Sequence, residues 1–264
     1  MSRQLSSDGE GNSDGNRWRG GGAAANQTKA TFTLPIFGPS GSPDAVKGIT
    51  IQIVNFSGGS NSSSATDGTL ITTCKNQLET IYATAGVKVT WNSTSNITLP
   101  STSINLDQVG AFSIDPTTSV LNPSTEESAL ITAVRNVLPV TTANANTVYL
   151  VFIGNFTSGD RGESFPDGFN PPTQAKNFAF VAGKSASSIN YTLPHEGGHL
   201  LLNQTTSDAT SGGHYTGSQN LQNLMHNGTS SVLPLTVLDT KRLWDDSSHA
   251  TQVTKLRTSR FVTP

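Results

Sequence analysis

The sequence contains a single cysteine, Cys74, so a disulfide bridge within one chain is excluded. Long apolar runs are also missing, and no stretch approaches the roughly 20 residues that a membrane-spanning helix needs. Charged residues make up only 13% of the chain, and the net charge is −2. The strongly basic surface that attracts nucleic acid or an anionic membrane is therefore not expected.

Serine, threonine, asparagine and glycine take the place of the charged residues, a composition common in secreted bacterial and phage-borne proteins. Residues 1–28 are rich in Ser, Asp, Gly and Asn and have almost nothing apolar to bury, which predicts a disordered arm. This arm lacks the charged and apolar regions of a standard signal peptide. We therefore expect secretion or delivery by a non-classical route, in which the arm could dock to a delivery particle or another partner.

Residues 29–264 are predicted to form one domain, in which strand and helix patterns alternate. Apolar alternation predicts strands at residues 48–56 and 87–91, and helical spacing predicts a helix at residues 69–84 between them, with Cys74 as a core thiol. Such a strand, helix and strand imply a parallel crossover. A second helix is expected from residue 125 to 137, and a buried central strand at residues 148–153.

The most informative stretch is residues 191–202, which contains the H-E-x-x-H pattern His195-Glu196-Gly197-Gly198-His199. On a helix, predicted at about residues 192–203, His195 and His199 lie on one face and can bind one zinc ion. The Glu196 carboxylate can then reach a water at the metal and act as general base. Two surface histidines on an ordinary helix are the alternative. Gly197-Gly198 favours the metal site, because glycine there costs helix stability unless another group approaches closely.

A third ligand must come from elsewhere in the chain. No glutamate follows Glu196, which excludes the zincin class that uses a downstream Glu as third ligand. The Gly212-Gly213 pair permits the sharp turn that would return His214 to the helix. The downstream candidates with suitable side chains are His214, Asp208, His226 and His249.

With a later histidine and an Asn-Leu-Met segment at about residues 223–228, the motif resembles the metzincin clan of zinc metalloendopeptidases. The resemblance implies that His195, His199 and His214 are zinc ligands, Glu196 is the general base and Met225 lies in the turn beneath the metal. The clan's spacing would place Gly at Leu202 and His at Thr205. Neither residue is present, so if His214 is the third ligand, residues 203–213 are an insertion relative to the clan. Asp208 stays a rival third ligand, because another zincin group uses Asp.

The same resemblance implies that the strand before the motif helix lies at the sheet edge. Its residues could pair with an extended substrate; they are Phe178, Ala179, Phe180 and Val181. An ordinary edge strand fits the sequence equally well. The loop at residues 157–176 contains Asp160, Glu163 and Asp167, which could bind a structural calcium ion by ligand type alone.

These patterns predict an α/β (α+β) fold of the zincin or metzincin type. It would comprise a twisted mixed sheet, two long helices, the active-site helix and a small C-terminal subdomain that includes a helix at about residues 237–255. The predicted function is zinc-dependent hydrolysis of peptide bonds in a protein or peptide substrate, by a secreted or injected effector. Two alternatives are a zincin-fold structural or binding module, such as a particle component with little catalysis, and a zinc hydrolase with a non-protein substrate.

Overall fold

The structure is a computed structural model that describes residues 46–60, 64–115, 117–118, 120–184, 189–203, 224–225 and 252–264. The predicted arm, residues 1–28, lies outside these ranges. None of the helices in the described ranges is long and apolar enough to cross a membrane. The elements in chain order are β1 (Lys47–Gly58), α1 (Gly68–Ala83), β2 (Val87–Trp91), β3 (Ser95–Leu99), β4 (Ser113–Ile114), β5 (Leu121–Asn122), α2 (Thr125–Val137), the 3-10 helix η1 (Thr142–Asn144), β6 (Val148–Ile153), β7 (Gly162–Ser164), the 3-10 helix η2 (Asp167–Phe169), β8 (Phe178–Ala182), α3 (Ile189–Leu202), α5 (Gln252–Thr258) and β9 (Val262–Thr263).

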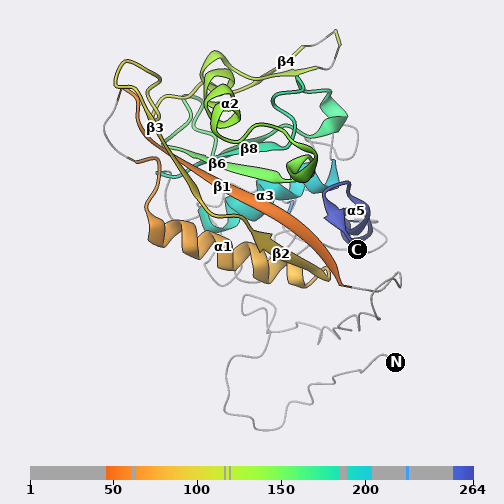
Figure 1. The fold of residues 1–264 in the computed structure, drawn as a ribbon. Coiled ribbons are helices and arrows are strands. Elements are labelled where there is room, and N and C mark those ends of the chain that lie inside the picture. The colour runs from red at the N-terminus through yellow and green to blue at the C-terminus, as the bar shows by residue number, and fades with distance from the viewer. Residues whose placement is uncertain are drawn as a thin grey trace, which may run out of the picture.

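Seven strands form one mixed sheet around the long strand β1 (Figure 1). Its main path runs β2-β1-β6-β8-β7, with parallel pairing until β7, which is antiparallel to β8. The first half of β1 pairs with β2 and the second half with β3, both in parallel. All six residues of β6 are buried, as the continuous apolar run predicts for a central strand. The predicted parallel pairing across α1 is confirmed.

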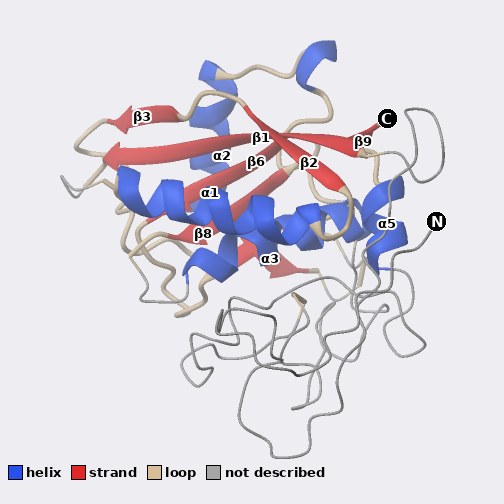
Figure 2. Ribbon diagram, turned by 90° about the horizontal axis from the view of Figure 1, so that it is seen from below, coloured by secondary structure: helices blue, strands red, loops and turns tan. Residues whose placement is uncertain are grey.

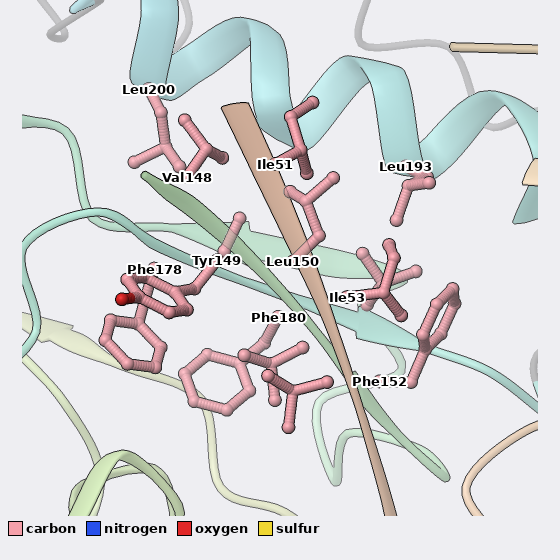
Figure 3. Close-up of a cluster of buried hydrophobic side chains, with 14 of the residues drawn as sticks. Ile51, Ile53, Val148, Tyr149, Leu150, Phe152, Phe178, Phe180, Leu193 and Leu200 are labelled. Atoms are coloured by element: carbon pink, nitrogen blue, oxygen red, sulfur yellow. The ribbon is translucent and has the colours of Figure 1, made fainter. Parts of the chain in front are cut away.

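Helices cover both faces of this sheet. Figure 2 shows α1 and α3 side by side on one face, with α2 on the opposite face. Figure 3 shows Leu193 and Leu200 of α3 above Leu150 of β6, while Tyr149 lies on the other side of that strand with Phe178. Strand alternation explains the division, because successive side chains of β6 point to opposite faces. Helices therefore pack on both faces of the sheet. The predicted α/β class is confirmed.

Local sequence accounts for both long helices. Asp67 caps α1 by accepting a 2.7 Å hydrogen bond from the backbone N–H of Leu70. Cys74 is completely buried in α1, so its prediction as a core thiol is confirmed, and burial raises the pKa of this thiol to about 12. In α2, Ser124 and Glu127 form a capping box that satisfies two backbone N–H groups at the helix start.

The region between β6 and β8 differs from its predicted form. Residues 157–176 are predicted as one loop, but they contain β7 and η2. Because β7 pairs along β8, the predicted edge position of Phe178, Ala179, Phe180 and Val181 is wrong. All four residues are buried between β6 and β7. Their backbone groups are already used within the sheet, so these residues cannot add a substrate strand.

The described C-terminal residues rejoin the main sheet. The predicted helix at residues 237–255 lies largely outside the described residues, which contain α5 instead. After α5, β9 pairs antiparallel with the start of β1 at Gly48 and Ile49. The remainder of the predicted C-terminal subdomain falls in residues 226–251, outside the described ranges.

Candidate metal centre

The helix that carries the motif, α3, is buried wherever its side chains are described. Every residue from 192 to 202 is buried. The phenol of Tyr82, on α1, donates a 3.0 Å hydrogen bond to the carbonyl of Pro194 within α3. Asn203 ends the helix with a left-handed φ of 50°, and its side-chain oxygen accepts a 2.7 Å hydrogen bond from Gly168 N–H. Contacts at its end and within it thus fix α3 against the rest of the fold.

Three side chains of α3 form the candidate centre: His195, Glu196 and His199. Their metal-ligating atoms all lie within 4.8 Å of one another, and all three residues are buried. The imidazole rings have centroids 4.8 Å apart and are inclined by 87°. Within the described residues this is the only group of three or more His, Cys, Asp or Glu side chains arranged closely enough to hold an ion. The four-residue spacing on a helix brings the two histidines together.

A backbone carbonyl orients the first histidine. Nδ1 of His195 lies 2.6 Å from the carbonyl oxygen of Leu224. A carbonyl can only accept a hydrogen bond, so this contact places the hydrogen on Nδ1 and the lone pair on Nε2. Histidines that bind metals commonly use such a second contact to set their tautomer and ring direction. The Leu224 carbonyl therefore leaves Nε2 of His195 as the ring nitrogen that could bind a metal ion.

The two glycines of the motif face close neighbours, as predicted from their position in the helix. A β-carbon at Gly197 would lie 2.7 Å from the phenol oxygen of Tyr82. At Gly198 it would lie 2.7 Å from the sulfur of Met225, which is fully buried against this face of α3. Real β-carbons do not approach other atoms this closely. Glycine is therefore needed at both positions for α1 and Met225 to pack against the motif.

The Glu196 carboxyl group lies against the edge strand β7. The hydroxyl oxygen of Ser164 is 2.6 Å from Oε2 of Glu196 and 2.9 Å from the main-chain oxygen of the same residue. A β-carbon at Gly162 would lie only 2.4 Å from Cγ of Glu196. Burial raises the pKa of Glu196 to about 8, the hydrogen bond from Ser164 lowers it, and the charge of Asp160 adds to the increase.

The structure describes only part of the predicted ligand set. His195, Glu196, His199 and Met225 come together, but the candidate third ligands, His214, Asp208, His226 and His249, lie outside the described residues. The chain leaves α3 at Asn203 and is next described at Leu224, beside His195. Leu224 and Met225 are thus the described residues from beyond α3 that lie against the candidate centre.

Sequence reasoning missed three groups that support the centre. They are the hydroxyl of Ser164, the phenol of Tyr82 and the carbonyl of Leu224. The Gly197-Gly198 pair signals a close neighbour but does not identify Tyr82. A serine in a polar loop carries no distinguishing pattern, and any residue supplies a carbonyl.

The structure gives the predicted calcium site no support. Asp167 forms a salt bridge with Arg260 at 2.5 Å, while Glu163 accepts a 2.9 Å hydrogen bond from Phe112 N–H. Asp160 is exposed, and these carboxylates form no metal-binding group among the described residues.

Comparison with known proteins gives structural likenesses at low sequence identity. No protein-family model matches the sequence, and a search of curated proteins finds no match. Among solved structures, metalloproteinase-II from Bacteroides fragilis is 15% identical with a TM-score of 0.44, and the match covers 80% of this chain and 52% of that one. A zinc-dependent peptidase from Methanocorpusculum labreanum is 14% identical with a TM-score of 0.38, and the match covers 77% of this chain and 99% of that one.

Proposed function

We propose that this protein is a zinc-dependent metalloendopeptidase of the zincin type. His195 and His199 would hold the metal, and Glu196 would act as general base and then general acid. The proposal rests on the buried His-Glu-His cluster of α3, in which a carbonyl already orients one imidazole. A hydrolytic zinc ion is commonly bound by neutral histidine nitrogens. The carboxyl group beside them is then free to act on the metal-bound water.

His214 is proposed as the third ligand, and Asp208 is the alternative. His214 and Asp208 both lie in the sequence between α3 and Leu224, whose carbonyl contacts His195. Gly212-Gly213 provides backbone freedom beside His214, whereas Asp208 has no neighbouring glycine. A third imidazole also agrees with the metzincin resemblance, in which a methionine such as Met225 lies below the ligands.

A bound zinc ion would supply a Lewis acid that acidifies water and polarises the carbonyl of the scissile peptide. Glu196 takes a proton from the attacking water and delivers it to the nitrogen of the leaving amine. Burial raises the pKa of Glu196 above the ordinary carboxyl value, which favours this group as one that both receives and returns a proton. Burial also limits exchange of this proton with bulk water.

The proposed substrates are proteins or peptides that bind in extended form along β7. This strand ends the main path of the sheet, and Gly162 and Ser164 within it contact Glu196. Among the described residues no further strand pairs with its outer side, and backbone groups there could pair with an added peptide strand. This role replaces the one predicted for residues 178–181. Secretion and an effector role remain predictions from composition.

The decisive test compares the whole wild-type chain with Glu196→Gln. We expect about one zinc per chain in both proteins by elemental analysis, because Glu196 is not a ligand. Casein digestion should be chelator-sensitive in the wild type and nearly absent in the variant. Protein without a divalent metal would instead support the structural-module alternative, and full activity of the variant would remove Glu196 from the mechanism.

A second pair of variants tests the third ligand. His214→Ala should weaken zinc binding by orders of magnitude in a competition titration with a chromogenic chelator, whereas Asp208→Ala should bind zinc nearly as the wild type does. Each variant serves as the control for the other, because both change the same segment. The reverse result would assign the site to an Asp-ligand zincin and remove the metzincin interpretation.

A further inference from the structure

Strand β7 holds the proposed general base on one of its faces. Gly162 and Ser164 are two residues apart, so they face the same side of the strand, and both contact Glu196. Gly162 leaves the space that the side chain of Glu196 occupies. The hydroxyl of Ser164 lies within hydrogen-bonding distance of the Glu196 carboxyl group.

We propose that Ser164 is a positioning residue that holds the Glu196 carboxyl group in the place from which it transfers protons. This inference rests on the proposed function. The hydroxyl of Ser164 lies within hydrogen-bonding distance of both Oε2 and the main-chain oxygen of Glu196. It therefore bridges the tip of the side chain to its own backbone, which restricts the rotamers of a flexible residue. A hydroxyl has one hydrogen and two lone pairs, so it donates to one of these oxygens at a time.

The remainder of β7 fixes the hydroxyl itself. β7 pairs with β8 along its length, so Ser164 sits on a strand of the sheet. On the opposite face, Glu163 accepts a hydrogen bond from Phe112 N–H and contacts the buried carboxyl of Glu127. Ser164 is itself buried, so water does not compete freely for Glu196. A group held in this way can fix a catalytic side chain more closely than a mobile loop could.

The test uses the full chain and three substitutions at Ser164. In Ser164→Ala, kcat should fall by about 10- to 100-fold, the usual loss when a supporting hydrogen bond is removed. Zinc affinity should not change, because the hydrogen bond that is lost is to Glu196 and not to His195 or His199. KM should not change either, because Ser164 is proposed to hold Glu196 and not the substrate. Ser164→Thr keeps the hydroxyl and should retain most activity, whereas Ser164→Val has the same shape without it and should resemble the alanine variant.

The Thr and Val variants control for the added methyl group, since both carry it in a buried position. Ser57→Ala is the control for losing a strand hydroxyl elsewhere, because Ser57 contacts Thr98 on β3 and not Glu196. It should leave kcat unchanged. Equal kcat in Ser164→Ala and wild type, or a parallel loss of zinc in Ser164→Ala, would overturn the proposal.

Crystal structures of the wild type and Ser164→Ala give a readout that does not depend on activity. The Glu196 carboxyl should occupy one position in the wild type and move or spread over several in the variant. An unmoved carboxyl would contradict the inference even in an inactive protein. By contrast, a wild type without zinc or proteolysis would remove the proposed function, so the two failures are distinguishable.

Discussion

At the scale of single residues, Gly197 and Gly198 occupy the middle of α3 because two neighbouring side chains fill the space of their missing β-carbons. Tyr82 approaches the first glycine and Met225 the second. Each glycine costs about 1 kcal/mol of helix stability relative to alanine. The hydrogen bond from Tyr82 to Pro194 and the packing of Met225 offset that cost.

We predict that Gly197→Ala destabilises the protein only while Tyr82 keeps its hydroxyl. The new β-carbon would meet the phenol oxygen at 2.7 Å but the ring carbon behind it at 3.8 Å. Overpacking of this kind costs about 1–3 kcal/mol. In a Tyr82→Phe background the same change should be neutral or stabilising, because alanine favours the helix. Thermal unfolding of the four proteins measures this, and equal losses in both backgrounds would contradict it.

At Gly198 the neighbour is a flexible methionine, so Gly198→Ala should cost less stability than Gly197→Ala. The sulfur of Met225 belongs to an unbranched, flexible side chain that can adopt another rotamer. The comparison of melting temperatures is internal, because the two glycines are adjacent in one buried helix. A larger loss at Gly198 would show that Met225 is held rigidly.

At the scale of elements, a pair of buried carboxyl groups connects α2 to β7. Glu127 of the α2 capping box faces Glu163 of β7, and Glu126 and Asp160 add negative charge nearby. Burial is the main cause that raises the pKa of both groups. In the described structure, the buried atom Oε1 of Glu127 has no hydrogen-bond partner. A proton shared between Glu127 and Glu163 would give this oxygen a partner.

This pair predicts that stability falls as the pH rises. Above the ordinary pKa of 4.5, the unfolded chain releases protons that the folded pair retains, so the folded state binds more protons. The free energy of unfolding then decreases with pH, and the stabilisation is lost as the pH passes through the raised folded pKa values. Glu163→Gln should reduce this slope, since its amide can donate to Glu127 while its oxygen accepts from Phe112.

Urea unfolding at a series of pH values from about 5 to 9 measures the slope, across the window between the ordinary and raised pKa values. Glu79→Gln is the control for losing a carboxylate elsewhere, because Glu79 is exposed on α1 and its hydrogen-bond partner is the indole of Trp91. It should leave the slope unchanged. A wild-type stability that rises throughout this range would show that the two carboxyls do not share a proton.

At the scale of the whole molecule, the C-terminal residues close the fold around β1. β9 pairs with β1, Arg257 donates a 3.1 Å hydrogen bond to the carbonyl of Gly86, and Arg260 pairs with Asp167. Phe261, between these contacts, is only 3% exposed. The C-terminal residues thus contact parts of the chain that are far from them in sequence.

We predict opposite outcomes for changes near the two ends of the chain. Phe261→Ala should cost about 3 kcal/mol or more, as losses of buried Phe do, and each 1 kcal/mol lowers the melting temperature of a domain this large by about 2–4 °C. Deletion of residues 1–28 should leave the melting temperature unchanged, because they contain little apolar surface to bury. A deletion that lowers it by several degrees would refute the disordered-arm prediction.

The sequence by itself determined the elements whose signals are local and repeated. The apolar run of β6 and the helical spacing around Cys74 are such signals, and the spacing of His195 and His199 is another. Each of these signals depends only on residues within one or two helical turns or along one strand. Buried positions in such an element need apolar side chains, so the pattern can be recognised without knowing the rest of the fold.

Only the tertiary structure decided which distant groups meet these elements. β7 has only three residues, too few for its sequence to show the alternation of a strand. Because β7 pairs with β8, β8 is not the edge strand that the sequence predicted. Ser164 reaches Glu196 across 32 positions in the chain, and Leu224 reaches His195 across 29. A single hydroxyl or carbonyl has no sequence pattern of its own, so its partner is set by how the sheet and helices pack.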